Sequence, residues 1–134
     1  MTKNDLEKIR DAEKIINAKK QELDALRYRA SGAGAIRYDK NRVQTSPQDY
    51  IAMAMDDIIK IEGQIEEERK ATEKMRADAY KIVRKMENVD QRTVLEWFYL
   101  NGLSMANTAL QMNMSERSAY YLKEEAVEVF LHTV

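Results

Sequence analysis

The sequence predicts an all-α protein, in which an antiparallel, coiled-coil-like pair of long N-terminal helices precedes a C-terminal domain of three short helices. Apolar residues recur at helical spacing over two long stretches. Glycine and proline are scarce, four and one in 134 residues, whereas a β-sandwich or barrel needs a turn signal every ~8–12 residues. The last third of the chain has fewer charges and more aromatics. We therefore expect two domains, 1–87 and 88–134.

The first helix is expected from Asp5 to about Tyr28. Its apolar residues fall on heptad positions, and the charged residues between them form a solvated face. One seam contains Ile9, Ile16 and Leu23, and the other contains Ala12 and Leu26, with Lys19 interrupting it. This pattern predicts an amphipathic helix.

A basic loop, residues 29–47, is expected after the first helix. Ser31–Gly34 breaks the helical pattern, and Ser46–Pro47 offers an N-cap followed by proline at the first helical position. Loops longer than ~12–15 residues are usually functional or disordered. The cations in and beside this loop are Arg27, Arg29, Arg37, Lys40 and Arg42. Two interpretations stay open: a solvated, mobile loop, or an auxiliary contact to phosphate or an acidic partner.

The second helix is expected from Gln48 to Glu87, about 60 Å long at 1.5 Å per residue. Its apolar residues again follow heptad spacing, and Glu68 and Thr72 interrupt the pattern. We expect this interruption where the shorter first helix runs out as a partner. Two helices alone leave apolar edges exposed, and a second copy of the chain is the simplest cover. The sequence therefore predicts a homodimer through residues 1–87.

Residues 88–134 are expected to form three short helices. Asp90 can cap a helix that runs to Leu100, where Asn101 and Gly102 end it. The second and third helices are expected at Met105–Met112, capped by Ser104, and from Ser115 to about Leu131, with Asn113 in the turn between them. Two helices joined by a short turn are typical of a helix-turn-helix. The expected core is Leu95, Phe98, Leu103, Ala109, Met112, Met114, Ala119, Leu122 and Ala126.

The composition argues against several functional classes. Without cysteine the chain can form neither a disulfide framework nor a thiolate metal site. No apolar run reaches the ~18 residues of a membrane span, and the charged N-terminus does not resemble a signal peptide. Glu66–Glu68 fan around a helix, His132 is the single histidine, and no phosphate-binding glycine loop appears. We therefore expect no enzyme activity, no catalytic residues, no metal, no cofactor and no membrane partner.

The C-terminal segment resembles region 4 of sigma-70-type factors, in the form found in a family of small phage late transcriptional regulators. The resemblance rests on two runs, Asn101-Gly102-Leu103-Ser104 and Met112-Asn113-Met114-Ser115-Glu116-Arg117-Ser118-Ala119-Tyr120. The segment from Val43 to Pro47 before the long helix fits the same family less specifically. The resemblance implies binding to double-stranded DNA, control of phage gene transcription and a location in the cytoplasm of a bacterial host cell.

The resemblance also implies which residues would contact DNA. The third helix would enter the major groove with its N-terminal residues, and Arg117 is the best candidate for a bidentate guanine contact. The predicted contact residues are Ser115, Glu116, Arg117, Ser118, Tyr120, Tyr121 and Lys123. Tyr120 is expected to be mainly a core residue, and Tyr121 to be exposed. Residues 88–134 hold only three Lys/Arg against six Asp/Glu, which departs from the basic surface of most DNA-binding domains.

Two other functions remain open at this point. A small terminase subunit also joins a helix-turn-helix to an oligomerisation segment, which would make the protein a DNA-packaging adaptor. A protein-interaction module that docks on host RNA polymerase would instead use the same fold without binding DNA. An exposed Leu110 on the second short helix would favour such docking.

Overall fold

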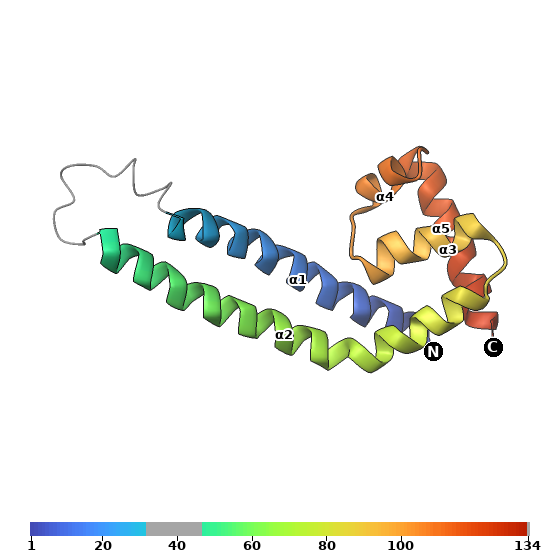
Figure 1. Cartoon of the computed structure of the whole chain (residues 1–134). Helices are drawn as coiled ribbons and strands as arrows, with labels where there is room; N and C mark the ends of the chain where they lie inside the picture. The colour runs from blue at the N-terminus through green and yellow to red at the C-terminus, as the bar shows by residue number, and fades with distance from the viewer. Residues whose placement is uncertain (32–46, 134) are drawn as a thin grey trace. The chain divides into compact units, whose positions relative to one another are not determined.

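The structure is a computed structural model that describes residues 1–31 and 47–133 (Figure 1). Within these residues the chain is all-helical, as the sequence predicts, and contains no strand. The elements in order are α1 (Lys3–Ala30), α2 (Pro47–Lys85), α3 (Val89–Leu95), the π-helical segment η2 (Glu96–Leu100), α4 (Met105–Gln111) and α5 (Glu116–His132). None of the helices in this part of the chain has an apolar stretch of the length that crosses a bilayer.

The two long helices lie close to their expected bounds. At the start of α1, Thr2 and Asp5 cap each other reciprocally: the Thr2 N–H donates to Asp5 Oδ2 (2.9 Å), and the Asp5 N–H donates to Thr2 Oγ1 (3.3 Å). The hydrogen bond from the Thr2 N–H lowers the pKa of Asp5. At its other end α1 continues to Ala30, so Arg29 belongs to the last helical turn and not to the loop that we predicted.

The described chain packs into two compact units. Unit 1 contains residues 1–15 and 69–134, and unit 2 contains residues 16–68. Both long helices pass from one unit into the other. Unit 1 therefore combines residues from both sides of the domain boundary expected after residue 87.

The core of unit 1 draws on almost every element of the unit. α1 contributes Leu6 and Ile9, and α2 contributes Ala79 and Val83. These side chains cluster with Met86, Val94, Leu95, Tyr99, Leu100, Ala126, Val127 and Phe130, all of them at most 4% exposed. The C-terminal helices are therefore packed on the beginning of α1 and the end of α2.

This core corrects one prediction about the long helices. We expected the pairing of the two helices to end at the polar residues Glu68 and Thr72. Instead, Leu6 and Ile9 of α1 pack with Ala79 of α2 beyond that point. Glu68 and Thr72 lie in the sequence between the α2 residues of two apolar clusters, one in each unit.

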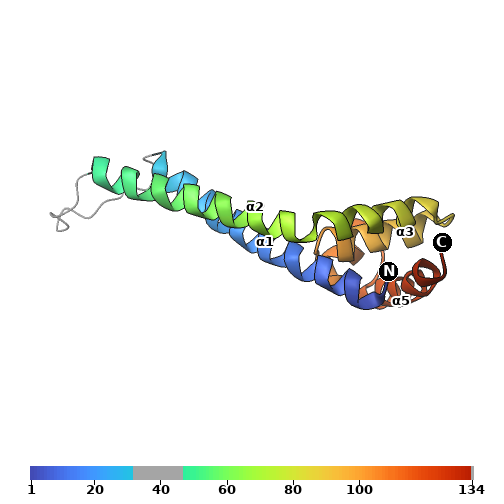
Figure 2. The ribbon, with the colours of Figure 1, turned by 90° about the horizontal axis from the view of Figure 1, so that it is seen from below.

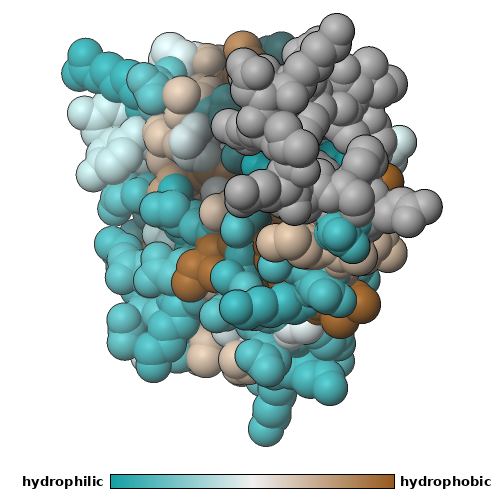
Figure 3. Space-filling model, turned by 90° about the vertical axis from the view of Figure 1, so that its left-hand side faces the viewer, coloured by the Kyte–Doolittle hydropathy of each residue, from teal (hydrophilic) through white to brown (hydrophobic). Residues whose placement is uncertain are grey.

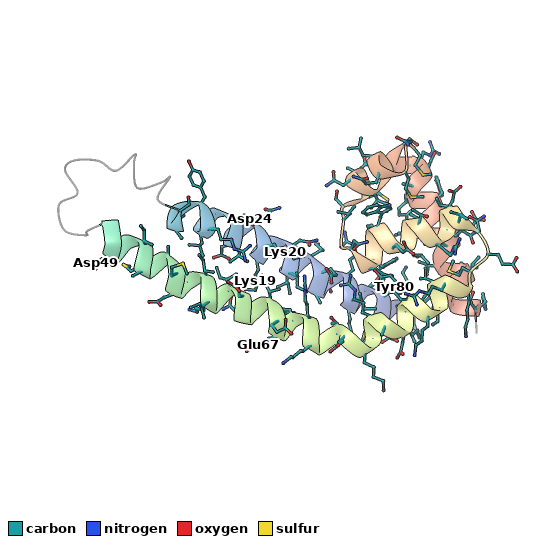
Figure 4. The ribbon with its side chains drawn as sticks, viewed as in Figure 1. Lys19, Lys20, Asp24, Asp49, Glu67 and Tyr80 are labelled. Atoms are coloured by element: carbon teal, nitrogen blue, oxygen red, sulfur yellow. The ribbon has the colours of Figure 1, made fainter. Side chains whose placement is uncertain are left out.

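The core of unit 2 is a single seam between two helices. The second part of α1 and the first part of α2 lie side by side (Figures 1 and 2). The seam consists of Ile16, Leu23, Leu26, Ile58, Ile61 and Ile65. Lys19, predicted to interrupt the heptads, donates from its Nζ to Gln64 Oε1 at 3.0 Å on α2 (Figure 4). A polar pair thus fills the interruption.

Candidate nucleic-acid interface

The segment that leads to the candidate interface begins with a capped helix. The N-cap of α3 is Asn88, whose Oδ1 accepts from the Gln91 N–H at 3.0 Å. The prediction that Asp90 caps this helix is therefore wrong by two residues: Asp90 lies in the first turn, where its charge favours the helix dipole. The helix continues as η2, and the Asn101 N–H donates to Glu96 O at 2.8 Å to close it.

Gly102 and Arg10 fix the chain between η2 and α4. Gly102 has a φ of +70°, and a Cβ at this position would lie 2.9 Å from Glu13 Cβ. Only glycine therefore fits both the backbone conformation and the approach to α1. Arg10, also on α1, donates from Nη2 to Leu103 O at 3.2 Å, and its guanidinium lies 4.1 Å from the centre of the Phe98 ring. α1 thus holds the residues immediately before α4.

The bounds of α4 follow from Ser104 at its start. Ser104 is the predicted N-cap, and its Oγ accepts from the Asn107 N–H at 3.1 Å. The Thr108 hydroxyl donates to Ser104 O at 2.8 Å, and the Thr108 side chain is completely buried. A threonine can occupy this apolar position because its hydroxyl finds a backbone partner within its own helix.

The turn between α4 and α5 is tight and hydrogen-bonded. Asn113 takes a φ of +54°, as its tolerance for the left-handed region predicts. The Asn113 N–H donates to Leu110 O at 3.3 Å, and the Met114 N–H donates to Ala109 O at 3.0 Å. This pair of bonds is the Schellman arrangement that ends a helix and reverses the chain. It fixes the direction in which α5 leaves α4.

α5 begins at Ser115, the predicted N-cap. Its Oγ accepts from the Ser118 N–H at 3.1 Å and donates to Ser118 Oγ at 2.9 Å. α5 packs against α4 and α3, and Ala109 and Ala119 are both buried. Small residues at a helix contact permit a close approach. Of the core residues that we predicted, four are buried (Leu95, Ala109, Ala119, Ala126) and five are half-buried (Phe98, Leu103, Met112, Met114, Leu122).

Six of the seven predicted contact residues are exposed at the start of α5: Ser115, Glu116, Arg117, Ser118, Tyr120 and Tyr121. Tyr121 is 58% exposed, as predicted, but Tyr120 is 47% exposed, so the prediction of a core position for Tyr120 is wrong. The two rings meet edge to face with centroids 5.7 Å apart, and the Arg117 guanidinium lies 5.7 Å from the Tyr121 ring. Exposed aromatic rings beside a cation form a surface suited to a polar, planar partner.

Lys123 differs from the other predicted contact residues because it is buried, at 8% exposure. Its Nζ lies 4.7 Å from the centre of the Tyr120 ring and 5.1 Å from that of Phe98. The same ammonium pairs with Glu124 at 2.9 Å and lowers the pKa of that carboxyl by hydrogen bonding. Lys123 therefore packs against the Tyr120 ring and is not part of the exposed surface. The sequence placed Lys123 on the expected third helix, but it could not show the contacts of Lys123 with Phe98, Tyr120 and Glu124.

The exposed charge on the C-terminal elements is mostly negative. Of the Lys and Arg in residues 88–133, Arg117 alone is exposed, because Lys123 is buried and Arg92 is half-buried. Asp90, Glu116, Glu125 and Glu128 are exposed acids on the same elements. The structure therefore leaves a single cation on the predicted contact surface.

The auxiliary basic loop falls largely outside the described residues, and this applies to Arg37, Lys40 and Arg42. Arg27 and Arg29 are exposed in the last turn of α1, within unit 2. In the part of the chain that the structure describes, no group of three or more His, Asp or Glu side chains is placed to hold a metal ion.

Residues 38–131 match the family described as "Protein of unknown function (DUF1492)". The chain belongs to this family. The match to DUF1492 begins in the segment between α1 and α2 and ends at Leu131, so it includes α2, α3, η2, α4 and the exposed start of α5. No curated protein matches the chain, and neither does any solved structure.

Proposed function

We propose that this DUF1492 protein is a DNA-binding transcriptional regulator of a phage or prophage, with α4, the turn and α5 acting as a helix-turn-helix. α5 would be the recognition helix, and the paired parts of α1 and α2 would be the dimerisation region. The helix-turn-helix part of this proposal follows from the resemblance of the C-terminal segment to region 4 of sigma-70-type factors.

The observation that supports this function best is the exposed start of α5. Six polar or aromatic side chains lie there on a helix that is capped at Ser115 and set in direction by the turn at Asn113. A recognition helix presents such N-terminal residues to base edges in the major groove. Arg117 would form a bidentate pair with guanine, and the Ser115 region would approach a phosphate.

Replacement of Arg117 tests this assignment. Arg117→Ala should weaken binding to the preferred site by about 1–3 kcal/mol, roughly 5- to 150-fold, because one bidentate base contact is lost. The preferred site is found by footprinting the protein on fragments of its source genome, and the affinity is measured by fluorescence anisotropy. The matched control is Lys14→Ala, which removes an exposed charge from α1 in the same unit. Equal affinities of the Arg117→Ala variant and the wild type would refute the assignment.

The proposed dimer is supported by an apolar strip on the outer side of α2 in unit 2. Met55 and Ile59 are 47% and 66% exposed, and nothing lies within 4 Å of a Cβ built at Gly63. These residues are four apart and so share one side of the helix. Figure 3 shows one face of the molecule, on which residues coloured brown for hydrophobicity lie scattered among hydrophilic ones. Apolar side chains of this size favour burial against a second copy.

Light scattering tests the dimer. The wild-type chain should have twice the mass of the monomer, and Ile59→Gln should shift it toward the monomer because an apolar contact is replaced by a polar side chain. Lys60→Gln, at the neighbouring exposed position, should leave the mass unchanged. A monomeric wild-type protein at high concentration would refute the dimer.

Docking on host RNA polymerase is the second candidate function, and one observation favours it. Leu110 on α4 is 72% exposed, more than any other large hydrophobic side chain among the described residues. Binding to the polymerase without any salt-sensitive shift of DNA would favour this function. Loss of that binding in Leu110→Ser would place the contact on α4.

A further inference from the structure

The part of α2 within unit 1 is rich in cations. Residues 69–85 hold seven Lys/Arg and two Asp/Glu. One of the seven, Arg76, is committed to the interior of the unit, since it pairs with Glu13 of α1 and lies 5.8 Å from the centre of the Tyr80 ring. The other six are exposed. The cations that are missing from α5 are therefore present elsewhere in the same compact unit.

Four of these cations, Lys70, Lys74, Lys81 and Lys85, form a stripe along one side of α2. Their spacings of four, seven and four residues place them within an arc of about 60° around a helix of 3.6 residues per turn. At 1.5 Å per residue, the stripe is about 22 Å long. The core residues Ala79, Val83 and Met86 occupy the opposite side of the helix. We call these four residues the lysine stripe.

The lysine stripe is not neutralised by neighbours. Among the described residues, none of its four ammonium groups takes part in an ion pair. Glu73 and Asp78 lie at the edges of the stripe, and exposed Arg84 adds a fifth cation beside Lys81 and Lys85. Within residues 69–85, these five cations against two acids leave a local excess of three positive charges on one face of one helix, and exposed Glu66 and Glu67 lie one turn before Lys70.

We propose that the lysine stripe binds the phosphate backbone of double-stranded DNA without reading its sequence. A row of lysines matches a polyanion because each ammonium replaces a condensed counterion, whose release favours binding. A protein partner fits less well, since lysine is depleted at protein–protein interfaces and the exposed apolar residues between the lysines are only the small Ala71 and Ala77. A membrane surface also fits less well, because a helix that lies in the interface needs a free apolar side, and here that side is in the core of unit 1.

This inference rests on the proposed function, and it resolves the charge problem of that function. α5 offers one exposed cation for contacts to bases, whereas affinity for DNA comes mainly from neutralised phosphates. The lysine stripe supplies that affinity from a different surface of the same unit. Sequence readout and sequence-independent attraction are therefore assigned to two helices, α5 and α2.

The test compares salt dependence on a random-sequence duplex. Lys70, Lys74, Lys81 and Lys85 are replaced together by Gln in the full-length chain, and binding to a labelled duplex is followed by fluorescence anisotropy at several salt concentrations. The slope of log K against log salt should become shallower by up to about 3.6, which is ~0.9 for each neutralised phosphate. A second variant with Arg at all four positions should keep the wild-type slope, because the charge is preserved. Removal of four exposed lysines outside the stripe, Lys8, Lys14, Lys20 and Lys60, is the matched control and should leave the slope unchanged.

The outcomes separate this inference from the proposed function. A slope that falls only in the stripe variant supports the inference even if no genomic site is preferred, a result that would refute the regulator. A slope equal in the stripe variant and the wild type overturns the inference, whatever Arg117→Ala does at a specific site. Absence of wild-type binding to random duplex at low salt overturns it too, as does stripe-dependent retention on anionic phospholipid vesicles without binding to DNA. Circular dichroism of each variant confirms that the helices are intact.

Discussion

The cores of the two compact units differ in how many elements build them. The core of unit 1 joins side chains from α1, α2, α3, η2 and α5, and nine of its members have at most 1% of their surface exposed. The core of unit 2 is one seam between two helices, and five of its six residues retain 5–9% exposure. Two helices can bury only the stripe between them, whereas several helices can enclose a side chain from all sides.

The two units also expose apolar side chains in different places. Unit 1 encloses its core, and its most exposed apolar side chains, Val89, Leu110 and Tyr121, lie outside that core. Unit 2 leaves Met53, Met55 and Ile59 exposed outside its seam. A second copy of the chain, as proposed above, would cover these side chains.

Among the predicted variants, Phe130→Ala should cause the largest loss of stability, and the loss should be in unit 1. The ring is 1% exposed in the core of unit 1, and its removal should lower the free energy of unfolding by about 3–5 kcal/mol. The single tryptophan, Trp97, lies in unit 1, so its fluorescence during urea unfolding reports that unit. Leu131→Ala, at the neighbouring position with 39% exposure, should change the value by less than about 1 kcal/mol. Similar losses for the two variants would mean that α5 does not bury Phe130.

Alanine at the two described glycines should have opposite effects in the two units. In unit 1, Gly102→Ala should lower the free energy of unfolding by about 1–3 kcal/mol, because the residue has a positive φ and faces Glu13. In unit 2, Gly63 lies within α2 with nothing within 4 Å of the added Cβ. Gly63→Ala should therefore raise helix stability by about 0.5–1 kcal/mol. Thermal unfolding followed by circular dichroism measures both, and a stabilising Gly102→Ala would contradict the packing of α1 on this turn.

Tyr99→Phe should have the smallest effect, and only at alkaline pH. Burial in the core, with Glu7 and Glu124 nearby, raises the pKa of Tyr99 to about 12 from 10.0. Above pH 10 the unfolded chain loses this proton first, so stability that is complete below pH 10 is lost as the pH rises toward 12. Urea unfolding at about pH 9 and pH 11 should show a smaller loss in Tyr99→Phe than in the wild type. Tyr28 is exposed in unit 2. The Tyr28→Phe variant should therefore lose as much free energy of unfolding between these two pH values as the wild type does.

Local features of the fold were largely predictable from the sequence. The long helices, the N-caps Ser104 and Ser115, and the turn at Asn113 each depend on residues adjacent in the chain. Such signals survive in one sequence because capping and left-handed turns have strong residue preferences. The predicted N-cap of α3, Asp90, lies only two residues from the observed N-cap, Asn88.

Features that depend on distant packing were not predictable. The heptad pattern predicted that Ile9 faces a partner helix, but not that the same core includes Phe130. Lys123 had the spacing of a contact residue, and only its neighbours Phe98 and Glu124 show that it is buried. The predicted contact of α5 with DNA, the dimer and the domain boundary after residue 87 stay predictions.

Because unit 1 unites residues 1–15 with residues 69–134, it cannot close before the residues of α5 have been synthesised. Unit 2 is made of consecutive residues, 16–68, and so can form as soon as they leave the ribosome. The beginning of α1 must then wait, with Leu6 and Ile9 uncovered, until α5 has been translated. A premature stop codon between Met86 and Phe130 would therefore leave the core residues of α1 and α2 without their α5 partners and expose the truncated product to aggregation or proteolysis.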